Sequence, residues 1–125
     1  MSLESDLKTY LHGASATNIK ALVSTRIEYG PLRQGQTLPA ITWHRVNTGF
    51  EQAVNRSIKG TLALLQFDAW ATTPAGAEAV IAALKTDLVG FTTSTHGMTF
   101  GFEGDVPEPE DIPVFHRALQ VSILT

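Results

Sequence analysis

The stretch from Thr61 to Gly90, TLALLQFDAWATTPAGAEAVIAALKTDLVG, changes its hydrophobic period from two to about 3.6 across a Thr-Thr-Pro junction. Its first part alternates, which predicts a strand with a core face at Ala63, Leu65, Phe67 and Ala69. Thr73 then supplies a helix N-cap with Pro74 at the first helical position. An apolar stripe follows, and Gly90 is expected to close the helix; the stripe comprises Ala77, Val80, Ile81, Leu84 and Leu88.

Helix and strand patterns fill most of the remaining chain. Leu3, Leu7, Tyr10 and Leu11 predict a short amphipathic helix, and residues 18–23 predict another helical turn with Ile19, Leu22 and Val23 inward. Further strands are expected near Ile27 and Tyr29, from Leu38 to Val46, from Met98 to Phe102, and from Val114 to Leu124. The order favours an α+β fold in a single domain, 1–125: a small antiparallel or mixed sheet of four to five strands with two helices packed on one face.

Two polar segments are predicted to be loops. Asn47 to Gly60 is too polar for a strand interior and too long for a tight hairpin, so we interpret it as an arm or interaction loop. EGDVPEPED, residues 103–111, carries two prolines and five carboxylates, which is typical of a solvated loop. The acidic run has two other interpretations: a hard-cation site, or a surface that pairs with Arg56 and Lys59 of a neighbouring copy.

Composition argues against several classes of function. The formal net charge of −3 disfavours a surface dedicated to nucleic acid phosphates. The absence of cysteine excludes disulfides, thiol nucleophiles and Cys-ligated zinc. No stretch approaches the roughly 18 consecutive apolar residues of a membrane span, and the start lacks the pattern of an export signal, so we expect synthesis in the cytoplasm and no membrane association.

Catalytic motifs do not occur in the sequence. There is no H-E-x-x-H pair, no G-x-S-x-G elbow and no glycine-rich phosphate loop, so no motif favours hydrolase or phosphate-binding chemistry. One alternative stays open: a cytoplasmic small-molecule- or metal-binding α+β domain in which folding gathers His44, His116 and the 103–111 acidic run.

The second face of the Thr61–Trp70 strand is half apolar. Leu62 and Leu64 share it with Gln66, Asp68 and Trp70, so a monomer would expose an apolar patch there. Trp70 is either an ordinary sheet aromatic or an anchor at a subunit interface. This pattern favours assembly with other copies or other proteins.

Three stretches in this order, LPAITWHRV, TLALLQFDAWATTPAGAEAVIAALKTDL and VFHRALQVSIL, resemble the small tail-completion or tail-terminator proteins of long-tailed bacteriophages and prophages. The resemblance spans roughly Leu7 to the C-terminus. The matching positions are structural ones: Leu38, Pro39, Trp43, Phe67, Trp70, Ala77, Ile81, Leu84, His116 and Leu119.

The resemblance implies a virion protein that has no enzymatic activity and no cofactor and assembles as a ring, usually a hexamer. Such a ring caps the finished tail tube and joins it to the head connector, so the implied partners are further copies, the tail tube protein and connector proteins. DNA would be only passing cargo. The candidate interface residues are Phe50, Arg56, Lys59, Leu62, Leu64, Asp68, Trp70, Glu108 and Glu110.

Overall fold

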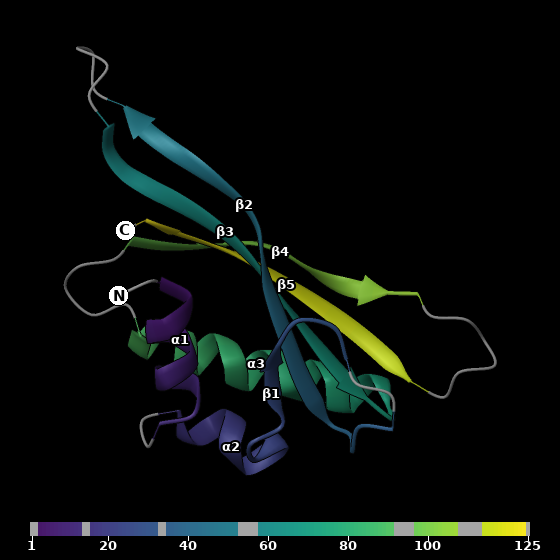
Figure 1. The fold of residues 1–125 in the computed structure, drawn as a ribbon. Helices are drawn as coiled ribbons and strands as arrows, with labels where there is room; N and C mark the ends of the chain where they lie inside the picture. Colours follow the sequence, from purple (N-terminus) through teal and green to yellow (C-terminus); the bar gives the residue numbers. More distant parts are fainter. Residues whose placement is uncertain are drawn as a thin grey trace.

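A computed structural model of the chain describes residues 3–13, 16–32, 35–52, 58–91, 97–107 and 114–124, with the backbone alone at 48–52, 58–62, 97 and 124. A twisted sheet forms one layer and the helices form the other (Figure 1). The elements are α1 (Leu3–Leu11), α2 (Thr17–Val23), β1 (Ile27–Tyr29), β2 (Ala40–Gln52), β3 (Ile58–Ala71), α3 (Pro74–Phe91), β4 (Gly97–Val106) and β5 (Phe115–Leu124).

The sheet has the strand order β1-β2-β3-β5-β4. β1 lies parallel to β2, and the other neighbouring pairs are antiparallel. The predicted fold class, a small mixed sheet covered by helices on one face, is confirmed. The helical turn expected at 18–23 is a separate helix, α2.

The hydrophobic core lies between the helices and one face of the sheet. Phe67 has no exposed surface, and Trp43, 1% exposed, stacks on it with ring centroids 5.7 Å apart. The predicted core positions of β3 and the apolar stripe of α3 are buried: Ala63, Leu65, Phe67, Ala69, Ala77, Val80, Ile81, Leu84 and Leu88. On β5, Leu119, Val121 and Ile123 complete the same cluster, as their alternation predicts.

The two ends of α3 differ in how well the sequence predicts them. At the start, the backbone N–H of Gly76 donates to the Thr73 hydroxyl at 3.0 Å, so the predicted N-cap is confirmed. At the other end the prediction is wrong, because the helix continues through Gly90 to Phe91. A Cβ at position 90 would lie 2.7 Å from the Tyr10 hydroxyl, so this glycine allows α1 to approach α3.

A buried aspartate on α3 fixes the two N-terminal helices. Asp87, 4% exposed, accepts the backbone N–H of Ile19 and the side-chain amide of Asn18, both at 2.8 Å, while its carbonyl accepts the Tyr10 hydroxyl at 2.7 Å. Burial, and secondarily the Asp87 charge, raise the pKa of Tyr10 above its ordinary value.

α2 is short, and its apolar stripe is narrower than predicted. Ile19 and Val23 are buried, but Leu22 is 37% exposed.

The prediction of a loop from Asn47 to Gly60 is wrong for most of that segment. β2 runs to Gln52 and β3 begins at Ile58. Asn47 pairs with Leu64 at the inner end of this ribbon, and Gln52 pairs with Ile58 at its outer end. This hairpin projects past the helices, so its sequence does not need a continuous apolar face (Figure 1). Residues 53–57 lie outside the described part of the chain.

The acidic loop predicted at 103–111 is also partly wrong, because β4 extends to Val106. Glu103 pairs with Lys85 of α3 at 2.6 Å and with Arg117 of β5 at 2.7 Å, and Arg117 reaches Asp105 at 2.7 Å. Hydrogen bonds from Lys85 and then Arg117 lower the pKa of Glu103. These partners are distant in sequence, so the local pattern gave no sign of them. The run from 108 to 111 lies outside the described residues.

Candidate functional site

The strongest candidate surface is the sheet face turned away from the three helices, which we call the open face. The register places Asp68 beside Thr42 and Ala118, and Trp70 beside His116. This face is mostly polar and uncharged. Its described side chains form a connected network rather than a cavity.

Asp68 is the centre of that network. One of its carboxylate oxygens, Oδ1, lies 2.6 Å from His116 Nε2 and accepts the Gln66 amide at 3.0 Å. Gln120 in turn donates to Gln66 Oε1 at 3.2 Å. Asp68 is only 6% exposed, because its neighbours lie over it. The buried carboxylate of Asp68 is therefore hydrogen-bonded by neighbouring side chains of the same face.

Trp70 packs against His116 on the open face, and the His116 side chain is only 9% exposed. Their rings stack at a centroid distance of 3.9 Å with planes 17° apart. The Trp70 indole N–H donates to the Thr42 hydroxyl at 2.9 Å. Trp70 is half-buried, so it combines a fixed orientation with an accessible ring edge. Trp70 therefore packs within the sheet, and its role as an anchor at a subunit interface stays a prediction.

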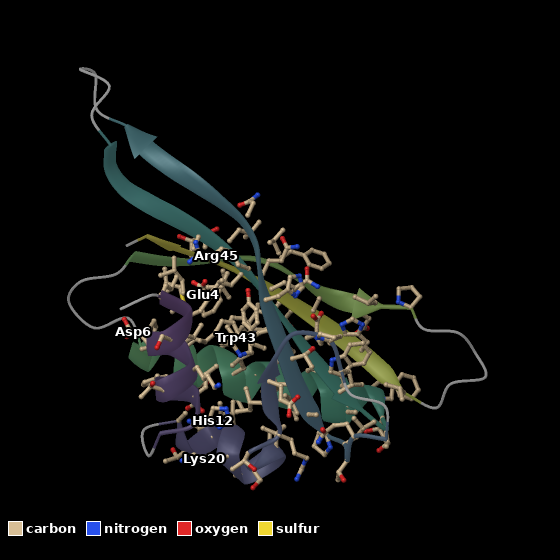
Figure 2. All side chains as sticks on the ribbon, in the orientation of Figure 1. Glu4, Asp6, His12, Lys20, Trp43 and Arg45 are labelled. Carbon is tan, nitrogen blue, oxygen red and sulfur yellow. The ribbon has the colours of Figure 1, made fainter. Side chains whose placement is uncertain are left out.

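The consecutive residues Trp43, His44 and Arg45 do not form a cluster. Trp43 enters the core, whereas His44 lies on the opposite face across from Gln66. Arg45 turns to the helix side, where its guanidinium donates to Glu4 of α1, as Figure 2 shows. These residues are neighbours on alternating faces of one strand, as the sequence pattern predicts.

The described residues do not support the alternative metal or small-molecule site. His44 lies in the row of Gln66 and Gln120, while His116 lies in the row of Trp70, four residue pairs further along the sheet. Within the described ranges, no three His, Asp or Glu side chains are grouped to hold a metal ion. Two hollows of about 320 and 340 Å³ lie elsewhere, beside α1 and β1, and share Lys8, Tyr29 and Trp43 as lining residues.

The structure places the nine candidate interface residues in three groups. Leu64, Asp68 and Trp70 lie together on the open face. Phe50, Lys59 and Leu62 lie in the projecting hairpin, where only the backbone is described. Arg56, Glu108 and Glu110 lie outside the described residues. Thr42 and Gln120 also belong to the open face and were not predicted, although both are polar positions that alternate with core residues along their strands.

In the described part of the chain, no helix combines the length and apolar character needed to cross a bilayer.

The Leu38-Pro39 peptide is cis, and the Pro39 carbonyl accepts a hydrogen bond from the Arg26 guanidinium at 2.9 Å, which positions the start of β2. The other positions of the resemblance are core or open-face residues.

Comparisons with known proteins agree with this description. The family model for tail completion protein gp17 matches residues 11–125. The fold is similar to a chain from the virion of a native gene transfer agent particle, with a TM-score of 0.70, 18% identity, and coverage of 98% of this chain and 93% of that chain. No curated protein matches the sequence. The chain therefore belongs to the tail completion protein gp17 family and is a structural component of a phage virion.

Proposed function

We propose that copies of this chain form a ring, a hexamer as in the proteins it resembles, which caps the phage tail tube and joins it to the head connector. Membership of the tail completion family supports a role at the phage tail. The observation that carries the proposal of self-assembly is the open face, where Trp70 and Leu64 are only half-buried and no described helix covers them.

A ring requires an interface in which one patch of a copy meets a different patch of the next, with a rotation that closes. The chain offers two different surfaces of this kind, the open face and the projecting hairpin (Figure 1). Stable interfaces bury about 800 Å² on each partner. A sheet face of this extent together with a hairpin suits that requirement.

The candidate interface residues have different roles in this proposal. Trp70 and Leu64 would supply the apolar contact at the centre, where aromatic side chains contribute most. Asp68, which is buried under Gln66 and His116, would position the Trp70 and His116 rings instead of touching a partner. Phe50, Lys59 and Leu62 would contribute from the hairpin, and Arg56, Glu108 and Glu110 would add complementary charge at the rim.

The remaining expectations follow from the same assembly. Residues 1–125 would act as one tail-terminator-like domain, with the tail tube protein and connector proteins as its neighbours in the virion. DNA would pass through the ring without being bound. A formal net charge of −3 fits that role, because a net-negative subunit does not bind phosphates strongly through its overall charge.

The first experiment measures the molar mass of the purified chain by size-exclusion chromatography with light scattering, and images the oligomers by electron microscopy. Leu64→Arg should abolish the oligomer, because it places a charge in the apolar contact. Ala82→Arg is the matched control, since Ala82 is exposed on α3, on the helix side. Equal loss of the oligomer in both variants would contradict the use of the open face.

A second experiment tests the capping role separately. Tail tubes assembled from the tube protein alone are mixed with the chain, and the tube ends are imaged by electron microscopy. The proposal expects additional density at one end of each tube, and Leu64→Arg should remove it. Rings that form but never occupy a tube end would contradict capping while leaving self-assembly intact.

A further inference from the structure

The outer edge of β2 is mostly unpaired. β1 pairs with β2 only at Ile41, Thr42 and Trp43, although β2 continues to Gln52. At Arg45 the backbone N–H donates to the Tyr29 hydroxyl at 3.3 Å. Beyond it, no strand among the described residues pairs with the edge of residues 46–52 that faces away from β3. We call this the β2 arm edge.

The opposite side of the sheet ends in a second unpaired edge. β4 is ten residues long and is the last strand in the order, with β5 as its partner among the described strands. We call its far side the β4 outer edge. Phe100 and Phe102 on this strand are 37% and 50% exposed. Long edge strands with apolar side chains readily accept another strand, and proteins usually protect them.

The two edges have compatible directions. β2 is antiparallel to β3, β3 to β5, and β5 to β4, so β2 and β4 run in opposite directions within one sheet. A rotation about an axis parallel to the strands places a second copy beside the first without reversing its strands. The β4 outer edge of one copy then meets the β2 arm edge of the next in antiparallel orientation. That is the geometry of the commonest strand pairing.

The two edges overlap in height over a short stretch. Asn47 of β2 pairs with Leu64, Leu64 pairs with Ser122, and Ser122 pairs with Thr99 of β4, so one row of residues runs from edge to edge. A neighbouring copy at the same height therefore brings residues 97–99 of β4 beside residues 47–49 of β2, and a displacement along the strands lengthens the contact, because the second half of β4 is level with the part of β2 that β1 covers. The irregularity between Phe100 and Glu103 divides β4 into two pairing stretches.

A closed ring requires pairing of unlike edges. Pairing of two β4 outer edges, or of two β2 arm edges, relates the copies by a two-fold axis and ends at a dimer. A β4 outer edge that meets a β2 arm edge leaves one edge of each kind free for the next copy, which is the head-to-tail arrangement that a ring requires.

We propose that neighbouring copies join by antiparallel pairing of the β4 outer edge of one copy with the β2 arm edge of the next, which extends the five-stranded sheet around the ring. This inference deepens the proposed function and rests on it, because it specifies how the ring closes: the hairpin of one copy is one patch, and the β4 outer edge at the margin of the open face is the other. The main-chain hydrogen bonds of the added pair supply affinity, and the exposed side chains beside it supply specificity.

Cysteine cross-linking tests the pairing, because the chain has no native cysteine. Asn47→Cys and Thr99→Cys each place a thiol at an exposed position on the open face of one edge strand. A short bismaleimide spacer then tolerates a register offset of two residues, about 7 Å. A mixture of the two single variants should give cross-linked dimers, while each variant alone should not.

The double variant should give a ladder of cross-linked species that ends at the size of the closed ring. Ala82→Cys, exposed on α3, is the control and should not cross-link to Thr99→Cys. Dimers from either single variant alone would overturn the inference in favour of a two-fold contact. Oligomers without the mixed cross-link would overturn the pairing and leave the ring intact, whereas absence of any oligomer of the unmodified chain would overturn both.

Discussion

The two faces of the sheet use alternate residues of the same strands in opposite ways. On the helix face, Phe67 and Trp43 are at most 1% exposed and are buried entirely by side chains of this chain. On the open face, Gln66 and Trp70 are held by hydrogen bonds and ring stacking, without a covering layer. One face is completed by folding, and the other is ordered by folding but left available. A structural subunit needs both properties.

The largest effect is expected from truncation on the helix face. Phe67→Ala should lower the free energy of unfolding by about 3–5 kcal/mol, because it removes apolar contacts and leaves a cavity beneath Trp43. Gln66→Ala, one residue away on the open face, should cost about 1 kcal/mol or less. Urea denaturation of both variants measures the contrast, and equal costs would contradict it.

Replacing a buried aspartate by alanine should lower the free energy of unfolding more in the helix layer than on the open face. Asp87→Ala leaves the Ile19 N–H without its acceptor inside the helix layer, so we expect a loss of about 2–3 kcal/mol. Asp87→Asn keeps one side-chain oxygen acceptor and should lose less. Chemical denaturation followed by circular dichroism measures both variants, and a cost below that of the corresponding change at position 68 would be inconsistent with this prediction.

On the open face, Asp68→Ala should cost about 1 kcal/mol of stability, less than Asp87→Ala, because the hydrogen bonds that it removes come from the side chains of Gln66 and His116 and not from a backbone N–H. Its larger effect should be on assembly, since the orientation of the Trp70 ring depends on stacking against His116. Light scattering should therefore show weaker self-association at a nearly unchanged unfolding midpoint. A variant that unfolds readily but assembles normally would reverse the roles assigned to the two faces.

The smallest effect concerns the ion pairs at the β4 edge. Because Lys85 and Arg117 lower the pKa of Glu103, its contribution to stability is present above its ordinary pKa of 4.5 and is lost as the pH falls through the lowered value. Glu103 is partly exposed, so the contribution is about 1 kcal/mol or less. Glu103→Gln should therefore flatten the acid limb of a stability–pH profile, and an unchanged limb would contradict this assignment.

The predictable parts of the candidate site were those that depend on alternation. The placement of Leu64, Asp68 and Trp70 on one face followed from a period of two, and the structure confirms it. The hydrogen bonds among Thr42, Trp70 and His116 did not follow, because these residues lie on three strands whose register the sequence does not specify. The hairpin was missed because polar residues on a projecting ribbon look like a loop.

The α+β class, the buried face of β3 and the capped start of α3 can be predicted from the amino-acid sequence, because they depend on local periodicity and composition. The contact of Glu103 with Lys85, the space that Gly90 leaves for Tyr10 and the extension of β2 beyond β1 become visible only in the folded chain. Such contacts join residues far apart in the chain. Their geometry is set by strand register and helix packing, which no local pattern encodes.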